Sequence, residues 1–332
     1  MPASMKSVPI RKALFVAAAT VALAVLAAVA VIEWRWTRRF DAPYPMVASS
    51  QDPATLARGE YIVYAAGACA YCHVPREVWP ALDRGERLPL TGHHVFPLPF
   101  GDIYSANLTP DRETGIGTRT DGELARVLRF GVRADGRAAV PLMEIQLRDD
   151  DLAAVLAYLK SRPAVSHLVP EHALSLFGKA LMAFAISPAA VETPRGPSPE
   201  GATVERGEYL ANHVSSCVTC HTDRGEDGAL VGPAFAGGQR MDVAADPTRV
   251  YVTPNLTPDH ETSPVGQWPE DAFVARFRMG PQVEGSPMPW GAFARMSDDD
   301  LRALYRYLRS LPPTRNRIGP AIQPKVRPSA VS

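Results

Sequence analysis

The stretch Cys69-Ala70-Tyr71-Cys72-His73 recurs later in the chain as Cys217-Val218-Thr219-Cys220-His221. In each copy two thiols lie three residues apart, on one side of a helical turn, and a histidine follows directly. Two such thiols can form thioethers to both vinyl groups of a porphyrin, and the adjacent imidazole then reaches the iron. A redox dithiol or half of a zinc site would not require that histidine. The pattern therefore predicts two covalently bound c-type haems, attached through Cys69, Cys72, Cys217 and Cys220, with His73 and His221 as proximal ligands.

The repeat extends beyond the two haem motifs. Residues 58–61 (Arg-Gly-Glu-Tyr) recur at 206–209, and residues 107–111 (Asn-Leu-Thr-Pro-Asp) recur at 255–259. Both pairs are offset by 148 residues, like the cysteines. An Asp-Asp-Asp-Leu run at 149–152 recurs at 298–301, offset by 149. Two copies at this period indicate a tandem duplication of one domain.

Each copy has the pattern of a mainly helical domain. After each Asp run, apolar residues fall at i, i+3, i+4 and i+7, starting from Leu152 and Leu301. Asp121 is expected to cap a further helix that ends at Gly131. Neither copy shows βαβ alternation. We therefore predict an all-α fold, in which two tandem cytochrome c-like haem domains follow a single N-terminal transmembrane helix.

The linker between the two copies carries an apolar stripe at helical spacing, formed by Leu174, Phe177, Leu181 and Phe184. We expect this helix to pack on a haem domain; a contact with the membrane interface is the alternative. The predicted boundaries are 1–40 for a membrane anchor or signal segment, 41–165 for cytochrome c domain 1, 166–199 for the linker with its amphipathic helix, 200–313 for cytochrome c domain 2, and 314–332 for a C-terminal tail.

Residues 13–32 carry no charged side chain. Twenty helical residues span roughly 30 Å, the thickness of a bilayer core. Trp34 and Trp36 follow the run, as is typical of a membrane interface. This length favours an uncleaved anchor over a cleaved signal peptide, whose apolar core usually has about 7–15 residues. Both interpretations export the rest of the chain, so we predict an inner-membrane protein with its haem domains on the periplasmic side.

The sixth iron ligand separates an electron carrier from an enzyme, because a His/Met-ligated iron is closed and has a raised potential. In the first copy Met143 lies 70 residues after His73. We predict Met143 as the distal ligand of this haem. His93 and His94 are the alternatives, and either would lower the potential.

In the second copy Met288 lies between two prolines, 67 residues after His221. We predict Met288 as the distal ligand of the second haem, with Met241 as the alternative. Met279 and Met296 align with apolar residues of the first copy, and we expect both in the core. The predicted iron ligands are therefore His73, Met143, His221 and Met288.

Asn107 and Asn255 open the two Asn-Leu-Thr-Pro-Asp segments. They are expected to hold haem propionates or nearby backbone, or to form a purely structural turn.

The chain has 332 residues, and its 35 basic and 35 acidic side chains give a formal net charge of zero. Residues 1–40 hold six basic and one acidic side chain, so the remainder holds 29 and 34. A basic membrane segment thus offsets a mildly acidic body, which argues against nucleic-acid binding. We expect a soluble redox partner to dock through a basic patch, with an association rate that falls as salt rises.

The chain resembles the cytochrome c subunits of membrane-bound alcohol and gluconate dehydrogenases. The resemblance covers nearly all of residues 57–313 and is carried by residues 59–61, the two haem motifs, residues 100–111, 114–117 and 287–289, and the following Asp run. It implies periplasmic electron transfer from a dehydrogenase toward the respiratory chain, with His and Met as axial ligands. Those subunits typically carry three haems, whereas this chain has two haem motifs and places its apolar segment at the N-terminus.

We therefore predict a membrane-anchored periplasmic dihaem cytochrome c that moves electrons between a dehydrogenase or quinol-linked donor and a respiratory-chain acceptor. The expected redox partner is a dehydrogenase subunit, a soluble cytochrome or a terminal oxidase. No acid/base or nucleophile constellation is evident, so the chain is not expected to be an enzyme by itself. The alternatives are a haem enzyme with one open iron, such as a dihaem peroxidase or a small-substrate oxidoreductase, and an assembly subunit with structural haems.

Overall fold

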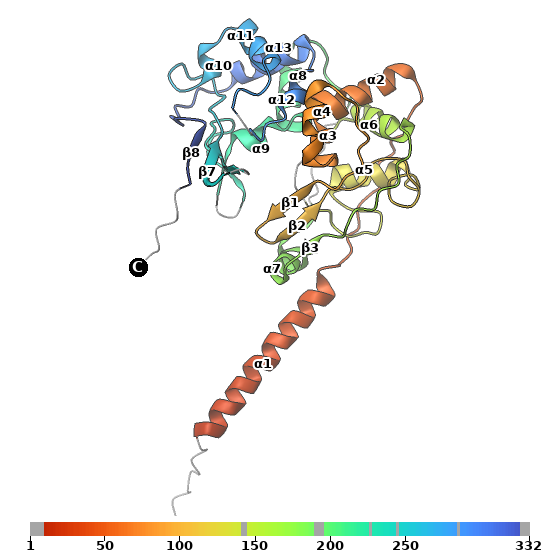
Figure 1. Cartoon of the computed structure of the whole chain (residues 1–332), viewed down its shortest axis with the longest axis vertical. Coiled ribbons are helices and arrows are strands. Elements are labelled where there is room, and N and C mark those ends of the chain that lie inside the picture. Colours follow the sequence, from red (N-terminus) through yellow and green to blue (C-terminus); the bar gives the residue numbers. More distant parts are fainter. Residues whose placement is uncertain are drawn as a thin grey trace, which may run out of the picture.

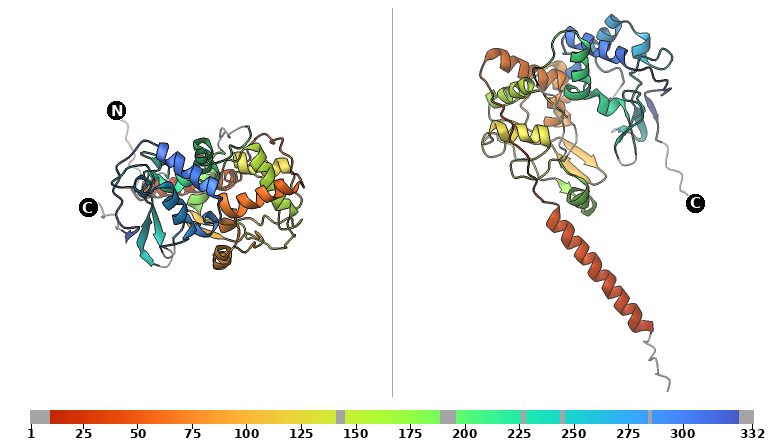
Figure 2. Two further views of the ribbon diagram at one scale, coloured as in Figure 1. Left: turned by 90° about the horizontal axis from the view of Figure 1, so that it is seen from above. Right: turned by 180° about the vertical axis from the view of Figure 1, so that it is seen from behind.

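The computed structural model describes residues 10–140, 145–188, 196–225, 228–243, 246–283 and 286–325. Its longest helix, α1 (Ile10–Arg35), projects from a body in which two domains lie side by side (Figures 1 and 2). Within Arg11–Arg35, an 18-residue window has a mean hydropathy of 2.8, and none of that window is buried against the rest of the protein. Length and composition make α1 a candidate membrane anchor.

The first domain is built on helices that precede and follow the first haem motif. They are α2 (Pro53–Tyr61) with its π-helical continuation η1 (Ile62–Ala66), α3 (Cys69–His73), the 3₁₀ turn η2 (Arg76–Val78), α4 (Trp79–Arg84), α5 (Asp121–Phe130) and α6 (Asp149–Ser161). Its strands are β1 (Val95–Leu98), β2 (Gly101–Tyr104) and β3 (Ala173–Leu174), and a short helix α7 (Leu176–Ala180) with the π-helical turn η3 (Leu181–Ala185) follows.

The second domain repeats the same helical plan. Its helices are α8 (Val204–Tyr209) with the π-helical continuation η4 (Leu210–Val214), α9 (Cys217–His221), α10 (Pro264–Gln267), α11 (Glu270–Arg278), α12 (Trp290–Phe293) and α13 (Asp298–Ser310). Its strands are β4 (Asp223–Arg224), β5 (Leu230–Val231), β6 (Arg240–Val243), β7 (Asp246–Val252) and β8 (Ile322–Pro324), the last of which comes from the expected C-terminal tail.

The prediction of an all-α fold is wrong, because the strands form three small antiparallel sheets, β1-β2-β3, β4-β5 and β6-β7-β8. Most of these strands have two to four residues, too few for a two-residue alternation to be recognised in the sequence. The outer strands also pair with distant segments, as Gly101 does with Leu174 and Tyr251 with Ile322. Tertiary packing rather than local pattern creates these sheets.

The predicted helix that ends at Gly131 is present as α5, and Gly131 adopts a left-handed conformation with φ 61°. Its N-cap is Thr120 rather than Asp121, because Thr120 Oγ1 accepts a hydrogen bond from Glu123 N at 3.2 Å. Asp121 instead accepts from Ser49 N at 2.7 Å and pairs with Lys160, which ties the chain that leaves α1 to the first domain.

Two crossed helix pairs, α2 with α6 and α8 with α13, form the centres of the two domains. A Cβ atom at Gly59 would overlap the carbonyl oxygen of Ala154, and one at Gly207 would overlap that of Ala303. Only glycine allows such a close approach of two backbones. The repeated Arg-Gly-Glu-Tyr segment therefore reflects a helix crossing that both domains require.

The arginine of that segment binds the third aspartate of the following Asp run in each domain. Arg206 donates to both carboxylate oxygens of Asp300, at 2.7 and 2.8 Å, and Asp300 is only 5% exposed. Arg58 makes the corresponding ion pair with Asp151. A bidentate pair at a buried crossing satisfies both charges, which would be costly to bury alone.

The tyrosine of the same segment connects the two domains reciprocally. Tyr61 Oη donates to Asp300 Oδ2 at 2.6 Å, and Tyr209 Oη donates to Asp151 Oδ2 at 2.9 Å. Burial and the neighbouring carboxylates raise the pKa of both phenols, so both remain donors. The interface therefore has approximate two-fold character, which follows from the duplication.

Candidate haem centres

The two haem motifs fold into nearly identical short helices. Both α3 and α9 start directly after a residue in the left-handed region, Ala68 with φ 49° and Ser216 with φ 48°. Neither residue is a glycine, so this conformation is strained. The strain recurs at matched positions between the π-helical turn and the first cysteine of each motif. We therefore infer that it is part of the backbone geometry that positions that cysteine.

Both motif histidines are oriented by a backbone carbonyl 33 residues further along the chain. His73 Nδ1 lies 2.9 Å from the oxygen of Ala106, and His221 Nδ1 lies 3.1 Å from that of Pro254. The carbonyl can only accept, so Nδ1 carries the proton and the lone pair is on Nε2. This is the arrangement by which proteins orient a metal-binding imidazole.

The protonation states of these side chains also fit haem attachment. Desolvation lowers the pKa of His73 and His221, which favours the neutral ring that binds iron. Within the part of the chain that the structure describes, neither Nε2 atom has a hydrogen-bond partner. The geometry therefore fits an axial ligand at both positions.

None of the four cysteines is paired in a disulfide. Burial raises the pKa of Cys69 and of Cys217 to about 12, so both are protonated at neutral pH. Among the described residues, no group of three or more histidine, cysteine or acidic side chains is arranged to hold a metal ion. Because the described residues do not bring together the four ligands of a structural zinc site, the two thiols and one imidazole of each motif fit thioether attachment better.

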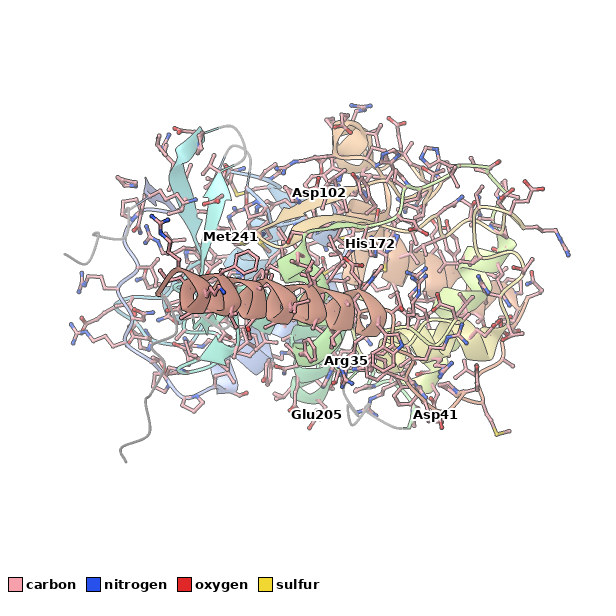
Figure 3. All side chains as sticks on the ribbon, turned by 90° about the horizontal axis from the view of Figure 1, so that it is seen from below. Arg35, Asp41, Asp102, His172, Glu205 and Met241 are labelled. Atoms are coloured by element: carbon pink, nitrogen blue, oxygen red, sulfur yellow. The ribbon has the colours of Figure 1, made fainter. Side chains whose placement is uncertain are left out.

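Of the predicted distal ligands, the structure describes Met288 but not Met143. Met143 lies outside the described residues. Met288 precedes α12 and packs, half-buried, against the hydrophobic core. The alternative, Met241, lies in β6 opposite Tyr251 and is labelled in Figure 3.

The two methionines expected in the core have different environments. Met296 is 1% exposed, which confirms the prediction. Met279 is 61% exposed, so that prediction is wrong. Met279 occupies the C-cap of α11, beyond the buried face formed by Phe273 and Val274.

The alternative ligands His93 and His94 lie beside the loop that orients His73. Gly92 N donates to the carbonyl of His73 at 2.8 Å, and His93 N donates to Ser105 O at 2.9 Å. His94 stacks on Trp79 with ring centroids 5.5 Å apart. Both histidines therefore follow a segment that is hydrogen-bonded to His73, the expected proximal ligand.

Asn107 and Asn255 hold in place the proximal loops, which are the loops whose Ala106 and Pro254 carbonyls orient His73 and His221. Asn255 is fully buried; its amide nitrogen donates to Thr314 O at 2.8 Å, and its oxygen accepts from Thr257 N at 2.9 Å. Asn107 makes the same contacts with Val165 and Thr109, at 3.0 and 2.9 Å. Backbone carbonyls accept from both amide nitrogens, and each loop is thereby fixed to the segment after the C-terminal helix of its domain.

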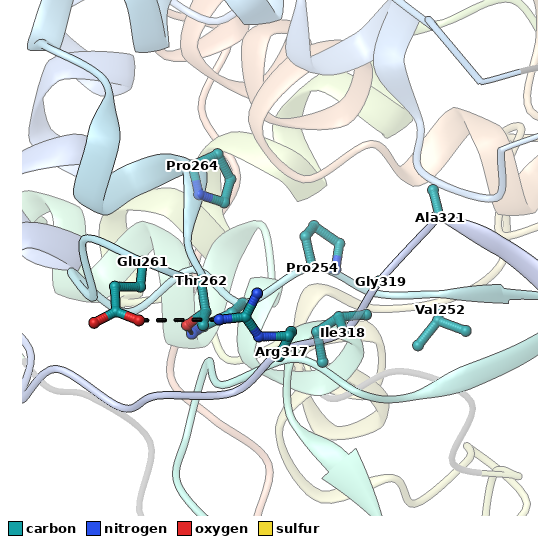
Figure 4. A pocket seen from close by; sticks show the side chains of 10 residues that line it. Val252, Pro254, Glu261, Thr262, Pro264, Arg317, Ile318, Gly319 and Ala321 are labelled. Carbon is teal, nitrogen blue, oxygen red and sulfur yellow. Dashed lines mark hydrogen bonds and ion pairs between the residues drawn. The ribbon is translucent and has the colours of Figure 1, made fainter.

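A pocket of about 320 Å³ lies beside the loop that orients His221 (Figure 4). Arg317 and Glu261 face each other in it at 3.9 Å. No cysteine or histidine lines it, so it is distinct from the haem-attachment residues. The lining residues are Val252, Pro254, Asn255, Glu261, Thr262, Pro264, Arg317, Ile318, Gly319 and Ala321.

Comparison with known proteins identifies the second domain directly. Residues 202–308 match the family model described as cytochrome c oxidase, cbb3-type, subunit III. Over 287 residues the chain is 31% identical to the cytochrome c subunit of a quinone-dependent alcohol dehydrogenase from Gluconobacter oxydans, covering 80% of this chain and 56% of the relative. It is 28% identical to a fructose dehydrogenase cytochrome subunit from Gluconobacter japonicus, covering 81% and 54%. It is 26% identical to a diheme cytochrome c-type protein from Cereibacter sphaeroides, covering 77% and 85%.

These matches confirm the predicted resemblance to cytochrome c subunits of membrane-bound dehydrogenases. They also confirm the cytochrome c domain and support haem c as its cofactor. The relatives are named as cytochrome subunits, in agreement with the prediction of an electron carrier rather than an enzyme. The chain spans little more than half the length of the two Gluconobacter dehydrogenase cytochrome subunits.

Proposed function

We propose, from the premise that the chain carries a cytochrome c domain and resembles dehydrogenase cytochrome subunits, that this protein is a membrane-anchored dihaem cytochrome c. It moves electrons between a dehydrogenase or quinol-linked donor and a respiratory-chain acceptor. Cys69, Cys72, Cys217 and Cys220 attach the haems, and His73 and His221 bind the irons on the proximal side. Each haem, when bound, supplies a one-electron redox centre.

The matched histidine geometry is the observation that carries this proposal. In both domains a carbonyl holds Nδ1, at 2.9 Å for His73 and 3.1 Å for His221, and leaves Nε2 for iron. Residues 41–165 and 200–313 each contain one of the two helix crossings, so each haem is proposed to have its own crossing.

The packing of the two motifs supports electron transfer within the chain. The π-helical turns η1 and η4 precede the two motifs and contact each other. Ser215 Oγ in the second domain donates to Ala66 O in the first at 2.7 Å. The two attachment motifs therefore both begin next to the domain interface, where a bound pair of haems could exchange electrons.

The distal side is proposed to be closed by Met143 in the first domain and Met288 in the second. The position of His93 and His94 beside the proximal loop favours Met143 over either histidine. Two His/Met-ligated irons would have raised potentials and no open site, as an electron carrier requires.

Haem counting in the full-length chain tests the proposal. Expressed with a periplasmic haem-attachment system, the chain should carry two haems, and the Cys69→Ala/Cys72→Ala variant should carry one. The Cys217→Ala/Cys220→Ala variant should also carry one haem and should retain the absorption spectrum of the first haem. A chain that binds no haem, or reduced protein that binds carbon monoxide at full occupancy, would refute the electron-carrier proposal.

A further inference from the structure

The linker helix α7 and its continuation η3 present an apolar face that the rest of the protein does not cover. Phe177 is 61% exposed and Phe184 is 56% exposed. Phe177 belongs to α7 and Phe184 to η3, and the Phe184 ring also lies 5.5 Å from the guanidinium carbon of Arg35. Leu176 is 47% exposed at the start of the same segment.

The opposite side of this segment is fixed to the first domain. Gly178 is buried, and a Cβ there would overlap the carbonyl oxygen of Phe100 in the turn between β1 and β2. Met182 and Ala183 are also buried. Because the backbone of α7 is in close contact with the sheet, the helix cannot rotate to hide its phenylalanines.

Contacts with α1 place α7 and η3 beside the C-terminal end of that helix, where it meets the body of the protein (Figure 1). Lys179 Nζ pairs with Glu33 Oε1 at 2.7 Å, and Arg35 Nε donates to Ala183 O at 3.0 Å. Glu33 directly follows the uncharged run of residues 13–32. At 1.5 Å of rise per residue, α7 lies within a few ångströms of the end of the apolar run.

Side chains typical of a lipid headgroup region surround the same level. Trp34 is 76% exposed, and Lys179 Nζ lies 5.3 Å from the centre of the Trp36 ring. Arg38 donates to Ile186 O at 2.8 Å. Tryptophan rings together with arginine and lysine are enriched where a protein crosses from hydrocarbon to water. Figure 3, seen from the side of α1, labels Arg35 at the body end of the anchor.

We propose that α7 and η3 lie in the membrane interface as a second contact with the bilayer that α1 enters, with Phe177 and Phe184 among the upper acyl chains. This inference rests on the proposed anchoring role of α1. We favour lipid as the occupant of this face for two reasons. The apolar side chains of α1 are also uncovered, and the exposed face lies beside Glu33, where α1 would leave the hydrocarbon.

The consequence is a fixed height and tilt of the first haem domain above the membrane. Ser175 N donates to Phe100 O at 3.0 Å, and β3 pairs with β2. Two residues after β2, Ala106 supplies the carbonyl that orients His73. A short, hydrogen-bonded path therefore connects the membrane contact with the proximal side of the first haem, which sets the position of that haem for a membrane-bound donor.

Depth-dependent fluorescence quenching tests the inference on the full chain in liposomes. The four natural cysteines are consumed by the haems, so Phe177→Cys or Phe184→Cys offers a single thiol for an environment-sensitive fluorophore. Leu23→Cys in α1 is the control for the anchor, and Met279→Cys, at a position 61% exposed in the second domain, is the aqueous control. Protein without an added cysteine should take up no label.

We expect lipids brominated near the headgroup to quench the label at 177 and 184, lipids brominated near the chain end to quench it at 23, and neither to quench it at 279. Quenching at 23 without quenching at 177 or 184 would overturn the interfacial contact alone. Absence of quenching at 23 would overturn the anchor and this inference with it. A label at 177 that is shielded from aqueous iodide but not quenched by lipid would indicate a protein partner on this face, and would also overturn the inference.

Discussion

Gly207→Ala is the substitution with the clearest expected cost, because the structure leaves no room for its methyl group. The new Cβ would overlap the carbonyl oxygen of Ala303 and lie 2.7 Å from Tyr307 Cβ. A carbonyl in the middle of α13 cannot move by a side-chain rotation, so α8 and α13 must separate. The buried pair between Arg206 and Asp300 spans the same crossing and would be strained by that movement.

The magnitude follows from two opposing effects. Overpacking costs about 1–3 kcal/mol, and we take the upper end because backbone is involved. Replacing a helical glycine by alanine returns about 0.5–1 kcal/mol. The net loss is about 2 kcal/mol of the free energy of unfolding, which corresponds to a drop of about 1 M in the urea midpoint at an m-value of about 2 kcal/mol/M.

The assay is urea unfolding of the haem-loaded chain followed by far-ultraviolet circular dichroism. Gly122→Ala in α5 is the matched control, since its Cβ would find Tyr44 Cβ at 3.5 Å, an ordinary contact. The control should be as stable as the natural chain or slightly more so. Equal midpoints for Gly207→Ala and Gly122→Ala would refute the close-crossing argument.

Three further outcomes are expected. Met288→Ala should halve the red-edge absorption band of Met–iron bonding, and the double variant with Met143→Ala should remove it; an unchanged spectrum in Met288→Ala would contradict the assignment. Tyr61→Phe removes a hydrogen bond to the Asp300 carboxylate across the domain interface, worth about 1.5–3 kcal/mol, so it should slow interhaem electron transfer measured by flash reduction. Tyr305→Phe is the control, because the Tyr305 hydroxyl donates to Trp268 O within one domain, and it should leave that rate unchanged. Hydrogen bonds from Thr262 lower the pKa of Asp259 below 3.8, so the ionised carboxylate stabilises the second proximal loop above that pH and loses this contribution as the pH falls further. Asp259→Asn should therefore flatten the acid titration of the second haem spectrum, and an unchanged titration would argue against this role.

The sequence was informative wherever the chemistry is local. Thioether attachment needs two cysteines and a histidine within five residues, so the spacing alone identified Cys69–His73 and Cys217–His221. The apolar periodicity after each Asp run likewise predicted α6 and α13. Met279 shows the limit of alignment within the repeat, since a residue at a helix end can face water even when its counterpart is apolar.

The duplication, the haem-attachment residues and the apolar N-terminal segment can all be recognised in the sequence, because each shows in short runs of neighbouring residues. The three-dimensional packing was needed to find which carbonyls orient His73 and His221, why Gly59 and Gly207 are glycines, and how Tyr61 and Tyr209 join the domains. It also decided the three sheets and the uncovered face of α7. These contacts join residues that are mostly tens to hundreds of positions apart, and no local pattern specifies them, since they arise when the helix crossings fix the loops in space.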